Sequence, residues 1–170
     1  MGKGKNRSVK FTFNDYPKTL AELQALPEAD LNTAFKTTAL VCITLMNYEQ
    51  NPEETLKMLD FLNGPNSVEG HERQFIKEYL GPKMYKIRSF FEGSTPENDY
   101  TPNKPYVITV KENPYSFDNE DWATLWVKSS GADSDRQIIL RRKPSTNQWF
   151  YTEIQILGDI RTPVSDNPWA

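Results

Sequence analysis

The stretch from Trp122 to Leu157 constrains the fold more than any other part of the chain. It contains three runs of strand-forming residues, and the polar turns SSGADSD and KPSTN separate them. The runs read WATLWVK, RQIILRR and QWFYTEIQIL. Short strand-forming runs joined by turns predict an antiparallel β-meander.

Alternation along these runs predicts one apolar and one mixed sheet face, because successive side chains of a strand point to opposite sides. The apolar face is expected to hold Ala123, Leu125, Val127, Phe150, Thr152, Ile154 and Ile156. The mixed face is expected to hold Trp122, Trp126, Arg141, Trp149 and Tyr151, with Lys128, Glu153 and Gln155 nearby. In a meander these mixed-face side chains form one continuous patch, which the chain's own ends either cover or leave open.

Residues 19–92 predict a layer of short helices, each with one apolar stripe. The segment Ala39–Met46 is apolar almost all round, which predicts the central and most buried helix. Thr19 opens the capping-box pattern TLAE, and Asn51 stands before a proline, a typical helix start. Cys42 lies in the apolar run and is expected to be a small buried core residue.

Helices first and strands last predict an α+β fold, with the apolar face of the sheet packed on the helical layer. We expect one domain over residues 1–170. Within it the sequence predicts a flexible basic arm (1–7), a first strand (8–13), the helical layer (19–92), the meander (105–157) and a tail (158–170). A curved sheet of the cystatin-like or nuclear-transport-factor-like kind would satisfy this arrangement.

Charge and cysteine content exclude several classes of function. The net charge is −3, and a basic stretch without acids is found at the start, where Lys3, Lys5, Arg7 and Lys10 lie. The rest of the chain is acidic overall, so nucleic-acid binding is not favoured. One cysteine rules out an internal disulfide and a cysteine-cluster metal site, and no cofactor is expected. No apolar run approaches the ~20 residues that span a bilayer, and no signal peptide is visible. A cytoplasmic protein without membrane contact is therefore predicted.

The loop between the first two runs is a candidate anion site. Its glycine permits a left-handed backbone, its serines offer hydroxyl groups, and its arginine can pair with an anion. The candidate residues are Ser129, Ser130, Gly131 and Arg136. A long hairpin turn, in which Asp133 and Asp135 bond their own backbone, explains the same residues without a ligand.

His71 is the single histidine and lies beside two glutamates at the start of a predicted helix. An exposed helix histidine explains this position as well as a general base does. The acidic turn 118–121 lacks the regular ligand spacing of a calcium loop. No catalytic or metal-binding residue is assigned.

Several motifs along the chain resemble one family. They are TLAELQALP at 19–27, NPYSFD at 113–118, SSGAD at 129–133 and NPW at 167–169. Together they resemble a family of small uncharacterised bacterial proteins known only as a domain of unknown function. This resemblance implies no established activity, cofactor or catalytic residue.

Three hypotheses of function follow from the residues. The first is a non-catalytic module that binds a protein partner, or another copy of itself, through the mixed aromatic face. The second is a small-molecule-binding or enzymatic domain, with a pocket between helices and curved sheet. Several of Tyr79, Tyr106, Trp126, Arg141 and Tyr151 would line that pocket. The third is a component of a phage-like particle.

Overall fold

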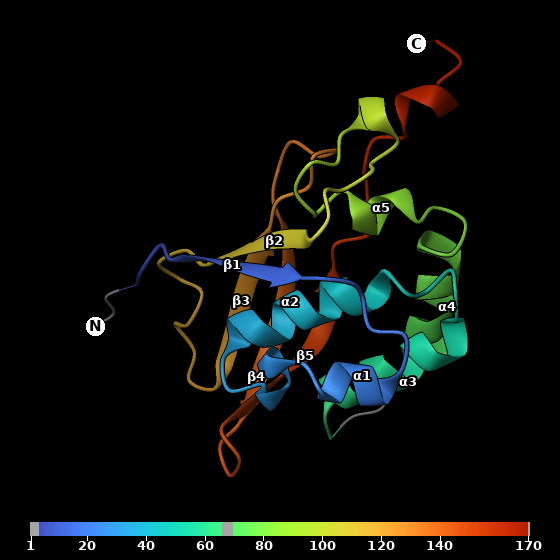
Figure 1. Ribbon diagram of the computed structural model, residues 1–170. Helices are drawn as coiled ribbons and strands as arrows, with labels where there is room; N and C mark the ends of the chain where they lie inside the picture. Colours follow the sequence, from blue (N-terminus) through green and yellow to red (C-terminus); the bar gives the residue numbers. More distant parts are fainter. Residues whose placement is uncertain (1–3, 66–69, 170) are drawn as a thin grey trace.

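The computed structural model describes residues 4–65 and 70–169, and it confirms the predicted α+β class (Figure 1). The strands are β1 (Ser8–Phe13), β2 (Tyr106–Lys111), β3 (Trp122–Val127), β4 (Arg136–Lys143) and β5 (Gln148–Gln155). The helices are α1 (Leu20–Gln24), α2 (Ala34–Leu45), α3 (Pro52–Asn63), α4 (Gly70–Tyr79) and α5 (Tyr85–Arg88). Short 3-10 turns cover Pro27–Asp30, Pro96–Asn98 and Val164–Asp166. Residues 1–3 of the predicted basic arm lie outside the described residues.

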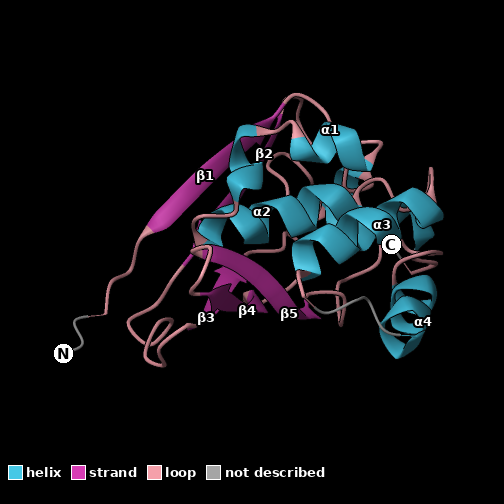
Figure 2. Cartoon of the chain, turned by 90° about the horizontal axis from the view of Figure 1, so that it is seen from below, coloured by secondary structure: helices cyan, strands magenta, loops and turns pink. Residues whose placement is uncertain are grey.

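The sheet is an open antiparallel sheet in the order β1-β2-β3-β4-β5. Its two halves are joined weakly, because β2 and β3 share only the pairs Val110 with Val127 and Lys111 with Trp126. The sheet bends at this joint. In Figure 2 β1 and β2 lie on one side of α2, and β3, β4 and β5 lie on the other.

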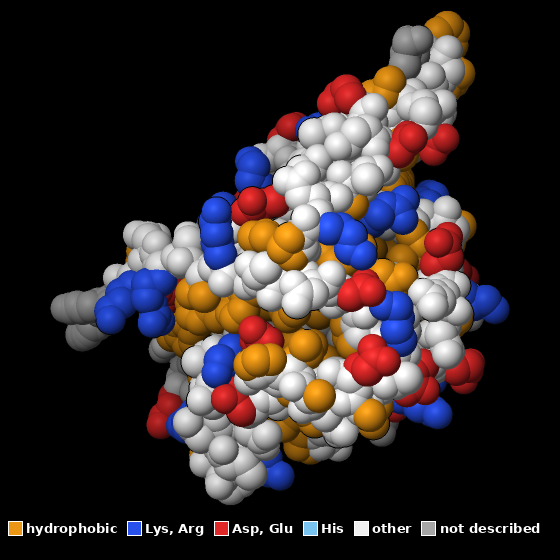
Figure 3. Space-filling view, viewed as in Figure 1, with side chains coloured by type: hydrophobic (Ala, Val, Ile, Leu, Met, Phe, Trp, Pro, Cys, Tyr) orange, Lys and Arg blue, Asp and Glu red, His pale blue; other side chains and the backbone are white. Residues whose placement is uncertain are grey.

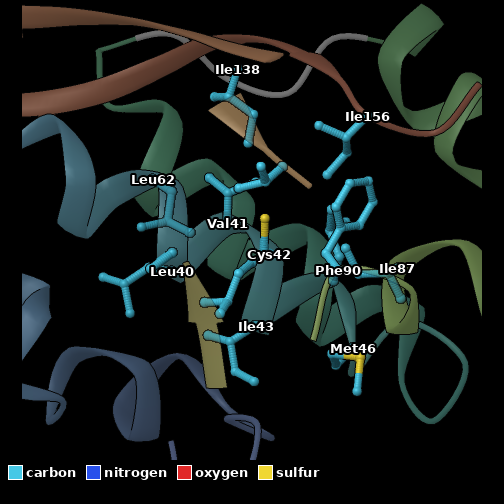
Figure 4. Close-up of a cluster of buried hydrophobic side chains, with 14 of the residues drawn as sticks. Leu40, Val41, Cys42, Ile43, Met46, Leu62, Ile87, Phe90, Ile138 and Ile156 are labelled. Carbon is cyan, nitrogen blue, oxygen red and sulfur yellow. The ribbon is translucent and has the colours of Figure 1, made fainter. Parts of the chain in front are cut away.

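Helix α2 fills the hollow of the bent sheet and contacts all five strands. Eleven of its twelve residues are buried, as its apolar sequence predicts. Figure 4 shows side chains of α2 meeting Leu62 of α3, Ile138 of β4, Phe90 after α5 and Ile156 after β5. The helix is therefore the centre of the hydrophobic core.

Two threonines, Thr33 just before α2 and Thr37 within it, make hydrogen bonds that position the helix. Thr33 caps its start by accepting the backbone N–H of Lys36 at 3.1 Å. Thr37 donates to the carbonyl of Trp149 at 2.7 Å, and this bond ties α2 to β5. Because a buried hydroxyl without a partner is destabilising, such bonds fix the position of the helix on the sheet.

A β-bulge at Thr152 divides β5 into two parts that alternate differently. Ile139 pairs with Glu153 and Leu140 pairs with Tyr151, so Thr152 is an extra residue on β5. Its Oγ1 donates to the carbonyl of Ile139 at 3.1 Å. An extra residue shifts the alternation on one side of it by one position. Tyr151 consequently shares the inner face with Leu140.

The prediction that Trp149 and Tyr151 lie on the mixed face is wrong for this reason. Tyr151 is fully buried on the helical side of the sheet. Trp149 is two residues away without a further bulge, so it points to the same side. Phe150, predicted on the apolar inner face, lies instead on the outer face opposite Arg141.

Helix α3 begins and ends as its sequence indicates. Asn51 caps it by accepting the backbone N–H of Glu54 at 3.1 Å, and Pro52 is its first residue. Gly64 ends it with a φ of 74°, in the left-handed region that favours glycine. A Cβ on Gly64 would lie 2.4 Å from the Phe150 ring, so the end of α3 packs directly against β5.

We predict that Cys42 makes the stability of the fold decrease in alkali. Burial raises the pKa of its thiol to about 12, from an ordinary value of 9.0. Between these values the folded chain keeps a proton that the unfolded chain has lost. The free energy of unfolding should therefore fall as the pH rises through this range, by up to about 1.4 kcal/mol per pH unit.

Urea unfolding at pH 8 and at pH 10 measures this effect, with Cys42→Ala as the control. The two proteins share every other titrating group, so the variant should lose less stability between the two pH values. Equal losses would contradict the prediction.

Candidate functional site

Trp122, Arg141 and Phe150 form a row across three strands on the outer face of the sheet. Trp122 pairs with Arg141, and Arg141 pairs with Phe150. The guanidinium carbon of Arg141 lies 5.0 Å from the centre of the Trp122 ring, and 38% of Trp122 is exposed. A guanidinium over an indole face is held there by electrostatic attraction. The row therefore presents flat apolar surface beside a positioned positive charge.

A groove of about 320 Å³ lies next to this row, where α3 ends against β5. We call it the β4–β5 groove. Its described lining residues are Asn63, Pro65, Asp121, Arg141, Arg142, Lys143, Pro144, Phe150 and Thr152. Helix α3 supplies one wall and the ends of β4 and β5 supply the other. The bulge matters here, because it places Phe150 on the outer face.

The charges that line the groove are mainly positive. Arg142 is clamped by Asp121, with its Nε at 2.9 Å and its second terminal nitrogen at 2.7 Å from the same carboxylate oxygen. It also donates to the side-chain oxygen of Asn147 at 3.2 Å. Among the described residues, neither Arg141 nor Lys143 has a carboxylate partner. Two positive charges are thus available to an anionic group.

Asn63 contributes a buried acceptor to the same place. Its side-chain nitrogen donates to the carbonyl of Tyr151 at 2.9 Å, and 6% of the residue is exposed. Its Oδ1 is buried and has no hydrogen-bond partner within the described residues. Leaving a buried acceptor without a donor costs about 1–3 kcal/mol. Because this oxygen is buried, it is not presented to a molecule bound in the groove.

The predicted continuous aromatic patch is smaller than its sequence suggests. Of the five residues predicted for it, the structure brings Trp122 and Arg141 together on the outer face. Trp126 is half-buried on the same face but lies four residues along β3 from Trp122, about 13 Å away. It lines a separate hollow with Lys111 and Asp135.

Trp149 belongs to a different aromatic cluster, on the inner side. Its ring meets Phe117 edge to face with centres 5.7 Å apart, and Phe117 lies 6.3 Å from Phe35. Arg7 covers Phe35 at 5.2 Å and is itself held by the buried carboxylate of Glu112. Figure 3 shows hydrophobic side chains gathered along the crease between β1 and α2 on this side of the molecule.

The described chain ends leave the Trp122 row uncovered. At the N-terminal end, Arg7 pairs with Glu112 after β2. At the C-terminal end, the backbone N–H of Arg161 donates to the carbonyl of Gly131, in the β3–β4 loop. Both segments are therefore attached elsewhere. The sequence left open whether the chain's own ends cover this face, and residues 4–7 and 158–169 do not cover the Trp122 row.

The predicted anion loop is used for internal contacts. Ser129 is buried and donates to the hydroxyl of Ser89 at 2.7 Å. Arg136 is directed at the carbonyls of Gly158 and Asp159, at 3.2 and 3.0 Å. Ser129 and Arg136 therefore do not converge on one open space, and the loop ties α5 to the C-terminal segment.

Gly131 is required by close packing. The left-handed backbone that a glycine permits is not used there, since among the described glycines a positive φ is found at Gly64 and Gly93. A Cβ at Gly131 would lie 2.2 Å from the hydroxyl of Tyr100. Close approach of that tyrosine explains the glycine.

Ser130 lines a second hollow, of about 370 Å³, between the end of α5 and the joint of β2 and β3. Hydroxyl groups of Ser94 and Thr109 and the lysines Lys111 and Lys128 also line it. Lys111 is paired with Asp135 at 2.8 Å. Phe90 and Phe91 line this hollow as well, but both are buried, whereas Phe150 of the β4–β5 groove is half-buried.

The pocket predicted between helices and sheet is not assembled from its five candidate residues. Tyr151 is fully buried, Tyr79 is 45% exposed on α4, and Arg141 lies on the outer face. His71 is exposed on the same helix as Tyr79. Among the described residues, no group of three or more His, Cys, Asp or Glu side chains could hold a metal ion.

Comparison with known families assigns the chain to a family. The family model described as Domain of unknown function (DUF6935) matches residues 15–164. The chain belongs to this family. The matched range contains every described helix and the strands β2 to β5 of the DUF6935 domain, and it ends before the NPW motif at 167–169. A search of curated proteins and a search of solved structures each found no match.

The family description assigns no activity, so the role of the chain has to be inferred from its own residues. The cystatin-like or nuclear-transport-factor-like shape of the sheet stays a prediction, because no matched structure supports it. Within the described ranges, none of the helices has the length and apolar character needed to cross a membrane.

We predict that Tyr151→Phe destabilises the fold by about 1–3 kcal/mol, because the Tyr151 hydroxyl donates to a carboxylate oxygen of Glu72 at 2.8 Å. Burial, followed by the neighbouring Glu72 carboxylate, raises the pKa of this hydroxyl and keeps it a donor. Urea unfolding measures the loss. Tyr115→Phe, at a site 76% exposed, is the matched control and should change stability by less than about 0.5 kcal/mol. Similar small changes in both variants would contradict the stabilising hydrogen bond between Tyr151 and Glu72.

Proposed function

We propose that this chain is a non-catalytic protein-interaction module, and that the β4–β5 groove binds an acidic segment carrying an aromatic side chain. One observation carries the proposal. The groove combines Arg141, Arg142 and Lys143 with the apolar surfaces of Phe150 and Pro144. Asp121, the carboxylate among its described lining residues, is neutralised by Arg142.

The residue types at the groove and the adjoining Trp122 row favour strong binding, in addition to the attraction between charges. Trp and Arg side chains contribute most often to the strongest contacts of protein interfaces. Here Arg141 is already positioned over Trp122, so little side-chain freedom would be lost on binding. A partner that carries acidic groups would associate faster with this positive surface, and added salt would weaken the attraction.

A fluorescence anisotropy titration with a short labelled peptide of alternating glutamate and tryptophan tests the proposal. The wild-type chain should bind it more tightly than a peptide of alternating lysine and tryptophan. Lys143→Glu and Arg141→Glu should each weaken binding by about tenfold, because each reverses a charge in the groove. Binding should also weaken as salt is raised.

Two further variants serve as controls. Lys128→Glu makes the same charge change at an exposed lysine outside the groove, and it should leave the affinity within about twofold. Arg141→Lys keeps the charge but loses the flat stack on Trp122, and it should give an intermediate affinity. Equal weakening by Lys128→Glu and Lys143→Glu would show an unspecific charge effect and overturn the proposal.

A further inference from the structure

The C-terminal segment presents the most exposed large apolar side chain in the described part of the chain. Trp169 is 92% exposed. The segment is anchored just before it, since Tyr100 donates to the carbonyl of Arg161 at 2.7 Å and Ser165 donates to Asp99. After this anchor the chain leaves the body, as Figure 1 shows at the end marked C. Trp169 is therefore displayed on a short segment with a fixed base.

This segment and the β4–β5 groove lie at opposite ends of the molecule. In Figure 1 the turn between β4 and β5 is at the lower end and the C-terminal segment is at the upper end. A chain cannot place Trp169 in its own groove while the anchor holds. A second copy of the chain can.

The chemistry of the segment matches the groove. The rings of Phe150 and Pro144 offer apolar contact to an indole. Asp166, three residues before Trp169, supplies a carboxylate for Lys143.

The spacing of these groups is compatible with simultaneous contact. Three residues lead from Asp166 to Trp169, so their backbones lie at most about 10 Å apart. Arg141 and Lys143 are two residues apart on one strand, about 7 Å. An indole beside Phe150, which pairs with Arg141, therefore leaves Asp166 within reach of Lys143.

We infer that the segment from Asp166 to Trp169 of one copy docks in the β4–β5 groove of a second copy, so that the chain self-associates head to tail. This inference rests on the proposed function, because it names the occupant of the same groove. A head-to-tail contact uses two different surfaces of each copy. Such contacts produce closed rings or growing chains rather than symmetric dimers.

Sedimentation velocity of the full chain over a range of concentrations tests the inference. The wild-type chain should form species larger than a dimer as concentration rises. Trp169→Ala removes the docking side chain, and Lys143→Glu repels Asp166 from the groove. Each variant alone should associate at least tenfold more weakly than the wild type. Thermal unfolding followed by circular dichroism should show that both variants keep the fold.

Mixing the two variants gives a sharper readout. Trp169→Ala keeps an intact groove and Lys143→Glu keeps an intact segment, so the mixture should form a one-to-one dimer and nothing larger. A symmetric interface elsewhere would not produce this complementation. Asp166→Lys combined with Lys143→Asp should restore association in one chain, while either change alone should not.

The outcomes separate this inference from the proposed function. If the wild-type chain stays monomeric, or if both variants associate as the wild type does, self-docking is wrong. Binding of the glutamate–tryptophan peptide would then still support a groove for another protein's acidic segment. If that peptide also fails to bind, the proposed function is wrong as well. Loss of association in Trp169→Ala alone, with Lys143→Glu unchanged, would place Trp169 at a different surface and overturn the inference.

Discussion

Burial of α2 in the bend of the sheet is the interaction on which the rest of the structure depends. The helix contacts all five strands, and nearly every residue of it is removed from water. A helix so apolar has no stable exposed face, so the sheet must surround it on more than one side. The short pairing between β2 and β3 allows this, because two residue pairs hold the halves together while leaving them free to bend.

The bulge at Thr152 then decides which side chains of β5 meet α2 and which face outward. It turns Tyr151 and Trp149 toward the helices, where the Tyr151 hydroxyl reaches Glu72 and the Trp149 carbonyl accepts from Thr37. It turns Phe150 outward, against the glycine that ends α3. The β4–β5 groove exists because Phe150, rather than Tyr151 or Trp149, lies on the outer face. A single unpaired residue therefore moves the candidate site from the middle of the sheet to its edge.

Strand alternation predicted part of this site. Trp122 and Arg141 are on the outer face as predicted, and the family membership agrees with the resemblance. Asn63, Pro65 and Lys143 were missed, because their importance comes from the contact of α3 with β5. The run RRKP at 141–144, three cations before a proline in a turn, was a signal in the sequence that could have drawn attention to this edge.

The sequence by itself determined the α+β class, the buried helix at 39–46 and the order of helices and strands. These follow from local hydrophobic periodicity and from caps such as Asn51, which act over a few neighbouring residues. Tertiary structure alone decided the bulge, the bend between β2 and β3 and the meeting of Asn63 with Phe150 and Arg141. A bulge depends on how two strands pair, and a groove depends on which elements pack together. Neither is encoded in the alternation of one strand.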